Sequence, residues 1–397
     1  MSSTGYYQYH TRTVIHSGPG SIIRVQALFE GMRARRVVLL SNEGLRETGI
    51  VDQLVSLFKT NGGGPELAGI FTDIAAEANC ETVNAALRFA REVAADAILA
   101  VGGGGVLDVS KGVKYALHHH FTDIREGLQA RLNMDSWPNA TRMDIPHIAV
   151  ATTAGSGAEV SPAAEFFNDA LGANCHLINP FLGPDMAVLD ANLTLGLSPQ
   201  LTATAGMDAL THALEAVASP LANHLSDAHA FRAAQLIMQN LPLAVASGKN
   251  VQARSDLLQA SAMAVSAFYA SLNIMPVHNC ANAFGALYSI PHGTAKAALL
   301  PVCIEVLPEF YLPNAGRLAA ALNLQVDGKR GEVLLGEVIA CLRGLQDTIG
   351  IDRTFARWDV KVENTEKIVA AIMTDPSGIF YQIPRDKAIE IVRKIAS

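Results

Sequence analysis

The chain has 397 residues, of which 50% are hydrophobic, and its formal net charge is −7. This length and apolar content predict a large core divided between two domains, and they exclude an intrinsically disordered protein. The acidic balance has no block of like charges, which argues against a nucleic-acid partner. Five scattered cysteines without a CxxC pair favour a reducing compartment, so the expected location is the cytoplasm.

The apolar segments predict a soluble protein. Residues 1–20 lack the basic start and the continuous apolar stretch of a signal peptide. The apolar run at 297–310 is interrupted by Pro301, Glu305 and Pro308, and no segment is long enough to span a bilayer. We therefore expect no membrane partner.

Strand and helix patterns alternate in the first half of the chain. Strand patterns occur at 35–44, 66–74, 95–105 and 147–157, and helical patterns at 45–64 and 81–94. The helix at 45–64 is expected to end in its glycines. This alternation predicts an α/β domain with a mostly parallel sheet, whose ligands bind beyond the carboxyl ends of the strands.

The second half of the chain is rich in alanine and leucine at helical spacing. Helices are expected at 199–219, 227–247, 253–272 and 331–350. The composition changes between Pro180 and Pro199, so we expect an α/β domain at 1–190 and an all-α helical domain at 191–397.

Two glycine turns follow two of the expected strands. The first is AVGGGGVLDVSK, in which backbone N–H groups can approach a phosphate and the following helix begins with Asp108 and Lys111. The second is ATTAGSGAEVSP, in which hydroxyl donors lie among glycines. Either turn alone is also compatible with a strand-to-helix connection or a capping turn that holds no ligand. Together they predict a nucleotide-binding site whose residues are Gly102, Gly103, Gly104, Gly105, Asp108, Lys111, Thr152, Thr153, Ser156 and Gly157.

Three histidines and one aspartate form the second candidate site. Asp208 and His212 are four residues apart on an expected helix, so they project from one face. His278 lies at the start of a later helix, and His292 lies in the PHG turn after it. Each of these residues alone is also compatible with an ordinary surface pair or a core histidine. The four together suit Fe²⁺ or Zn²⁺ with room for a substrate oxygen.

These motifs resemble the iron-containing (group III) alcohol dehydrogenase family of the dehydroquinate synthase-like superfamily. The resemblance covers nearly the whole chain and includes VIHSGPGSI, GGGGVLDVSK, TTAGSGAEVSP, AVLDANLTLGLSP, GMDALTHALEA and IPHGTAKAALLP. It implies an N-terminal Rossmann-like NAD(P) domain, a C-terminal metal-binding domain, a metal in the cleft between them, and a homodimer. It also implies that the metal ligands are Asp208, His212, His278 and His292.

The chain departs from the family pattern at several positions. Asn282 stands where the family has a histidine suited to proton relay, and the preceding segment FYASLNIMPV is altered and looks one residue longer. Asn42 stands where many members have an aspartate that binds the ribose 2′-hydroxyl, which leaves both NAD and NADP open. Asn174 occupies the place of a cofactor-contacting lysine.

The resulting hypothesis is hydride transfer between NAD(P) and a small-molecule alcohol or aldehyde whose oxygen lies on a divalent metal. One alternative is a hydroxyacid-oxoacid transhydrogenase, and a second is metal-dependent chemistry without net redox, as in the synthase branch. A third is a catalytically degenerate nucleotide-binding protein, which Asn282 and Asn174 favour and the intact metal ligands oppose.

Overall fold

The computed structural model describes residues 7, 9, 11–60, 64–75, 77–136 and 138–396. The chain divides into two compact units. An α/β unit contains 11–153 and 157–196, and a helical unit contains 154–156 and the described residues of 1–10 and 197–397. Each unit has hydrophobic core clusters of its own.

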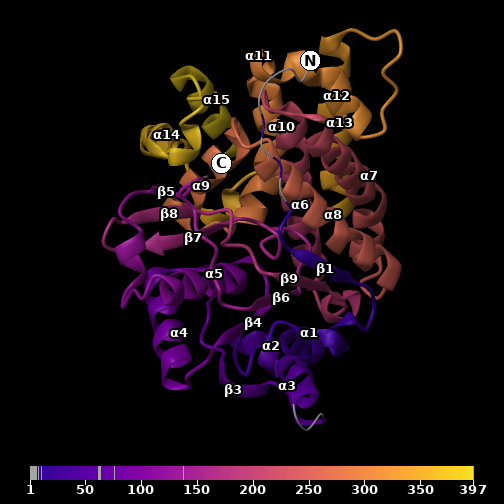
Figure 1. The fold of residues 1–397 in the computed structure, drawn as a ribbon. Coiled ribbons are helices and arrows are strands. Elements are labelled where there is room, and N and C mark those ends of the chain that lie inside the picture. Colours follow the sequence, from indigo (N-terminus) through magenta and orange to yellow (C-terminus); the bar gives the residue numbers. More distant parts are fainter. Residues whose placement is uncertain are drawn as a thin grey trace. The chain divides into compact units, whose positions relative to one another are not determined.

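A parallel sheet forms the centre of the α/β unit (Figure 1). Its order is β1-β9-β6-β4-β2-β3, and every adjacent pair is parallel. The expected parallel α/β fold is thereby confirmed. Every residue of β4 and β6 is buried, because helices cover both faces of such a sheet. The strands are β1 (Val14–Ser17), β2 (Arg36–Leu40), β3 (Glu66–Phe71), β4 (Ala97–Gly102), β6 (His147–Ala151) and β9 (Met186–Leu189).

Helices connect these strands. The single helix expected at 45–64 is wrong: the structure has two helices, α2 and α3, because Gly49 takes a left-handed conformation with φ 80°. The glycines at 62 and 63 that were expected to end it lie outside the described residues. The helical elements of this unit are η1 (Ser21–Arg24), α1 (Val25–Gly31), α2 (Glu43–Glu47), α3 (Ile50–Thr60), α4 (Cys80–Glu92), α5 (Gly104–His118), η2 (Ile124–Gly127) and η3 (Ala191–Thr194).

A second, smaller sheet was not expected from the sequence. Its order is β5-β8-β7, with β7 and β8 antiparallel. The strands are β5 (Leu132–Met134), β7 (Ala163–Asn168) and β8 (Ala173–Ile178). Buried and half-buried residues alternate in β8, where Asn174 and His176 lie between apolar residues, so the signal for this strand was present in the sequence.

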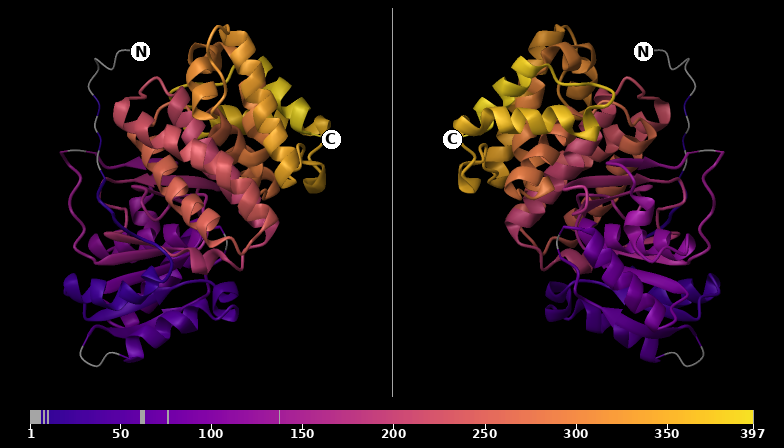
Figure 2. Two further views of the ribbon diagram at one scale, coloured as in Figure 1. Left: turned by 90° about the vertical axis from the view of Figure 1, so that its right-hand side faces the viewer. Right: turned by 90° about the vertical axis from the view of Figure 1, so that its left-hand side faces the viewer.

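The described part of the helical unit contains helices and no strand, as the alanine-rich and leucine-rich pattern predicted (Figure 2). Its first two long helices pack closely: a Cβ added to Gly206 of α6 would lie 2.3 Å from Leu241 Cδ1 of α7. The α-helices are α6 (Pro199–Ala218), α7 (His224–Ala246), α8 (Val251–Ala270), α9 (Pro276–Tyr288), α10 (His292–Val306), α11 (Pro308–Tyr311), α12 (Ala315–Ala321), α13 (Gly331–Ile349), α14 (Thr365–Thr374) and α15 (Arg385–Ile395). The 3₁₀ turns are η4 (Leu312–Asn314), η5 (Ala356–Trp358), η6 (Val362–Asn364) and η7 (Pro376–Gly378).

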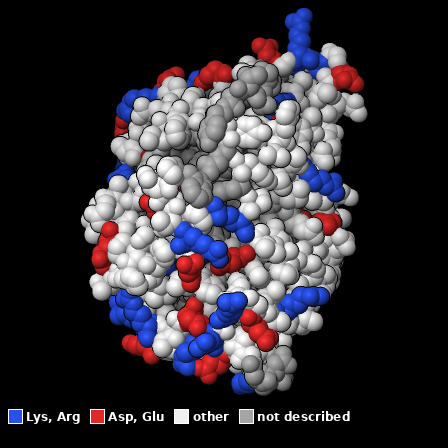
Figure 3. Space-filling model, in the orientation of Figure 1, with Lys and Arg blue, Asp and Glu red and all other residues white. Residues whose placement is uncertain are grey.

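Two surface properties bear on partners. No helix in the described part of the chain combines the length and apolar character needed to cross a membrane. On the face shown in Figure 3, acidic and basic side chains are interspersed.

Candidate active site

Helix α6 presents three ionisable side chains on one face. Ser198 caps its N-terminus by accepting a hydrogen bond from Leu201 N, and Pro199 occupies the first turn. Asp208, His212 and Glu215 follow at i, i+4 and i+7, so they lie along one stripe of the helix. All three are buried, and buried polar groups require partners.

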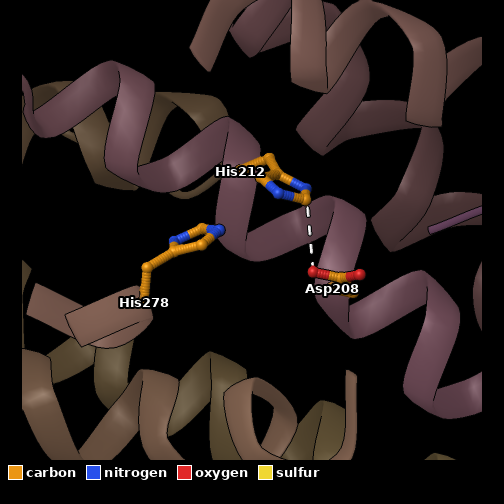
Figure 4. A group of neighbouring side chains, drawn as sticks. All are labelled: Asp208, His212 and His278. Carbon is orange, nitrogen blue, oxygen red and sulfur yellow. Dashed lines mark ion pairs between the residues drawn. The ribbon is translucent and has the colours of Figure 1, made fainter. Parts of the chain in front are cut away.

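Asp208, His212 and His278 converge on one point (Figure 4). One potential ligand atom from each of these residues lies within 4.8 Å of those from the other two. His212 Nδ1 lies 3.7 Å from Asp208 Oδ1, which is too long for a hydrogen bond. Among the described residues this buried nitrogen has no hydrogen-bond partner. One carboxylate and two imidazoles form a ligand set typical of Fe²⁺ or Zn²⁺, so these residues fit a divalent metal.

Glu215 positions His278. Its Oε1 accepts a hydrogen bond of 2.7 Å from Val277 N, and its Oε2 lies in a very short contact with His278 Nδ1. Burial raises the pKa of Glu215 to about 8, although the Val277 hydrogen bond and the Lys296 charge act against this rise. Two acceptor atoms at this separation must share one proton. Because Nδ1 faces Glu215, Nε2 is the ring nitrogen that can ligate a metal, and carboxylates often orient metal-binding histidines in this way.

A buried lysine adjoins the same group. Lys296 lies on α10, and its Nζ is 2.8 Å from Asp208 Oδ1. Both residues are buried. Burial alone would raise the pKa of Asp208, but the charge of Lys296 and its hydrogen bond hold this pKa below its ordinary value. Asp208 is therefore a carboxylate that already has a cation beside it.

Aromatic and backbone contacts fix the two imidazoles. The Phe268 ring stacks on His278 with centroids 4.7 Å apart and meets His212 edge-on at 5.1 Å. Burial lowers the pKa of His212 well below its ordinary value despite the nearby Asp208, and the ring also has a hydrogen bond with the backbone of Gly155. Neutral imidazole is the form that binds a metal.

His292 does not belong to the converging group. The turn expected at PHG is wrong in detail, because His292 is the first residue of α10. The start of this helix does lie against α6: a Cβ on Gly293 would be 3.0 Å from Thr204 O and 3.7 Å from Asp208 Cβ. The His292 ring itself lies near α9, since a Cβ on Gly285 would be 3.8 Å from its Nε2.

Asn282 connects α9 to η7. Its amide donates hydrogen bonds to Ser377 Oγ at 3.0 Å and to Asp375 Oδ1 at 3.4 Å. The side chain is buried. Asn282 therefore acts as a tether between two segments of the helical unit.

The candidate nucleotide loops lie at one edge of the large sheet. β2, β4 and β6 are parallel neighbours, so Asn42, Gly102–Gly105 and the Thr152–Thr153 turn follow their adjacent carboxyl ends. Thr152 N donates a 3.1 Å hydrogen bond to Gly102 O, and a Cβ on Gly103 would be 3.3 Å from Thr153 Oγ1. These glycine positions leave the backbone accessible where parallel sheets bind ligands.

The remaining predicted nucleotide residues have diverse surroundings. Lys111 is fully buried, and its ammonium donates to Asp108 Oδ1, Ser161 Oγ and Ala163 O. Asp108 also accepts a hydrogen bond from Glu165 N, so Asp108 and Lys111 both bind the backbone of β7. Asn42 caps α2 by accepting a hydrogen bond from Leu45 N. Gly157 has a left-handed backbone with φ 59°, and Ser156 belongs to the helical unit.

Sequence reasoning missed Glu215 and Lys296. The signal for Glu215 was its i+7 spacing from Asp208 on an otherwise apolar helix. Lys296 lies four residues after His292 in a segment that is otherwise apolar from Ala295 to Cys303. A charged residue inside such a run needs a buried partner.

Two family matches cover nearly the whole chain. Residues 12–191 match "Iron-containing alcohol dehydrogenase", and residues 202–396 match "Fe-containing alcohol dehydrogenase family, C-terminal". The 1,3-propanediol dehydrogenase of Klebsiella pneumoniae is 34% identical over 385 residues, covering 96% of this chain and 95% of the relative. The chain belongs to the iron-containing alcohol dehydrogenase family. The resemblance inferred from the sequence motifs is thus confirmed.

One further comparison concerns the fold and another concerns the sequence. A solved structure of 1,3-propanediol oxidoreductase has a TM-score of 0.87 and 29% identity, covering 98% of this chain and 99% of that one. The bifunctional aldehyde-alcohol dehydrogenase AdhE of Escherichia coli (strain K12) is 31% identical over 340 residues, which are 81% of this chain. This chain spans only 38% of the length of that relative.

Proposed function

We propose that this chain is a metal-dependent alcohol dehydrogenase that uses NAD or NADP and acts on a small-molecule alcohol or aldehyde. The observation that carries the proposal is the convergence of Asp208, His212 and His278 within 4.8 Å. In aldehyde reduction, hydride moves from C4 of the reduced nicotinamide to the carbonyl carbon and a proton is added to the oxygen. A bound Fe²⁺ or Zn²⁺ would supply Lewis-acid polarisation of the carbonyl.

Each side chain has a proposed task. Asp208, His212 and His278 hold the metal, and the resemblance supports His292 as a fourth ligand. Glu215 keeps the His278 proton on Nδ1 and so orients the ring. Asn282 is an amide that cannot transfer a proton near neutral pH, so the substrate proton comes through water, the nicotinamide ribose or another side chain.

The nucleotide is proposed to bind at the carboxyl edge of the large sheet. The contact residues are Asn42, Gly102–Gly105, Thr152, Thr153, Ser156 and Gly157. Asp108 and Lys111 are proposed to support the turn and not to contact the nucleotide directly, since Lys111 is fully buried and is paired with the half-buried Asp108. We further propose that this site belongs to a domain at 1–190, that the metal site belongs to a domain at 191–397, and that the protein is a cytoplasmic homodimer.

The test is NADH and NADPH oxidation with an aldehyde panel, using metal-stripped protein reconstituted separately with Fe²⁺ and Zn²⁺. Asp208→Ala and His278→Ala should lose bound metal and turnover. His224→Ala removes an exposed histidine at the start of α7 and serves as the control. Full metal content and turnover in the first two variants would refute the ligand assignment.

A further inference from the structure

Lys296 differs from the other charged groups of the candidate metal site because it is a cation. Its side chain is 7% exposed and its Nζ is 2.8 Å from Asp208 Oδ1. A buried ammonium of this kind needs a hydrogen-bonding anion, and Asp208 is that anion.

A divalent metal would change this balance. Asp208 and Lys296 form an ion pair with no net charge, and Glu215 and His278 share one proton between Oε2 and Nδ1, so this second pair carries one negative charge. A metal adds two positive charges to this group and competes with Lys296 for the Asp208 carboxylate. The loaded site therefore carries one net positive charge, and the Lys296 ammonium has to share the Asp208 carboxylate with the metal.

We propose that Lys296 selects substrates that carry an anionic group, namely short aldehydes or alcohols with a carboxylate next to the reacting carbon. This inference rests on the proposed dehydrogenase function and defines its substrate class. The carboxylate accepts hydrogen bonds from Lys296 and neutralises the excess charge. Hydride and proton transfer are the same as for a neutral aldehyde.

The position of Lys296 sets the distance between the two substrate groups. The three proposed ligand atoms lie within 4.8 Å of one another, and Nζ is 2.8 Å from Asp208 Oδ1. On this proposal, an ammonium 2.8 Å from a metal ligand contacts a carboxylate attached directly to the carbonyl carbon. Glyoxylate has this arrangement, and acetaldehyde is its neutral counterpart of equal carbon number.

The decisive experiment compares kcat/KM for glyoxylate and acetaldehyde in metal-loaded wild type, Lys296→Met and Lys296→Arg, with metal content measured in each. The ratio should favour glyoxylate in wild type and fall about tenfold to a hundredfold in Lys296→Met, the range of a charge-assisted hydrogen bond. Lys296→Arg should keep most of the preference. Lys394→Met removes an exposed charge from the same unit and should leave the ratio unchanged.

Metal affinity gives a separate readout. If Lys296 selects the anion, Lys296→Met should bind metal at least as tightly as wild type, because Asp208 loses a competing cation. An unchanged glyoxylate preference in the fully loaded variant would overturn the proposal and leave Lys296 as a counter-ion of Asp208 only. If Lys296→Met does not fold, Lys296→Gln is the second neutral variant.

Binding of a non-reacting acid separates this inference from the function on which it rests. Calorimetry with propanoate and its neutral counterpart propanamide should show at least about tenfold tighter binding of propanoate to loaded wild type, and loss of this difference in Lys296→Met. If neither aldehyde is reduced, the proposed function fails while this binding result still decides the role of Lys296. Equal binding of the two compounds to wild type overturns the inference.

Discussion

Glu215→Gln tests how the protein prepares His278 for a metal. In the wild type, Oε1 accepts from Val277 N and Oε2 faces His278 Nδ1. A glutamine of the same shape keeps the first bond with its carbonyl oxygen, which turns its NH₂ group toward Nδ1. Nδ1 must then accept, so the single ring proton of neutral His278 moves to Nε2, the nitrogen that is proposed to ligate the metal.

The expected loss follows from this change of tautomer. Removing a carboxylate that orients a metal-binding histidine lowers metal affinity by about ten to a hundredfold, or about 1.4–2.8 kcal/mol. The measurement is Zn²⁺ affinity by competition with a chelating dye. Glu159→Gln is the control, because Glu159 is an equally buried glutamate of the α/β unit. Equal Zn²⁺ affinity of wild type and Glu215→Gln, with the fold retained, would refute the reasoning.

Three further predictions concern packing, cofactor choice and pH. Gly206→Ala should lower the free energy of unfolding by about 1–3 kcal/mol, because the added Cβ would lie 2.3 Å from a side-chain atom of α7. The control Gly344→Ala has open space at its Cβ and should raise the free energy of unfolding by up to about 1 kcal/mol. Urea unfolding measures both changes. Asn42→Asp keeps the cap of α2 and should shift the ratio of kcat/KM values at least about tenfold toward NADH over NADPH. The same change at Asn79, which caps α4, should leave this ratio unchanged. An unchanged ratio in Asn42→Asp would show that residue 42 does not face the ribose. Burial raises the pKa of Glu159 from 4.5 to about 7, so its contribution to stability is fully present below pH 4.5 and is lost as the pH rises through 7. Between pH 5 and pH 8, the free energy of unfolding of the wild type should fall by up to about 3 kcal/mol relative to that of Glu159→Gln. Parallel pH profiles of the two proteins would contradict this prediction.

Local sequence patterns were sufficient to predict the parallel sheet and the long helices. Strands such as β4 are uniformly apolar, and α6 is capped by Ser198 and Pro199, so these elements are specified by neighbouring residues. The spacing of Asp208 and His212 is likewise local. The small sheet was missed because β5 is only three residues long, the polar and apolar residues of β7 do not alternate, and the strands are stabilised by pairing with each other.

Contacts between residues that are distant in the sequence are not encoded in local patterns. Glu215 meets His278 across 63 positions, and Lys296 meets Asp208 across 88. Periodicity identifies which side chains share a helix face but not which helix lies opposite. The two residues that set the charge of the candidate site therefore emerged only when α6, α9 and α10 were placed together.

Asn282 illustrates the difference between detecting a departure and interpreting it. The sequence identified an amide where the family has a relay histidine, and this suggested only a loss of proton transfer. In the structure the amide gains two acceptors, Ser377 Oγ and Asp375 Oδ1, from a segment more than ninety residues away. Because a histidine cannot donate from one nitrogen to both acceptors as an amide does, the substitution and the η7 turn are coupled. Restoring the histidine alone would therefore disturb this tether, and an Asn282→His variant should change the position of η7 as well as the proton-transfer group.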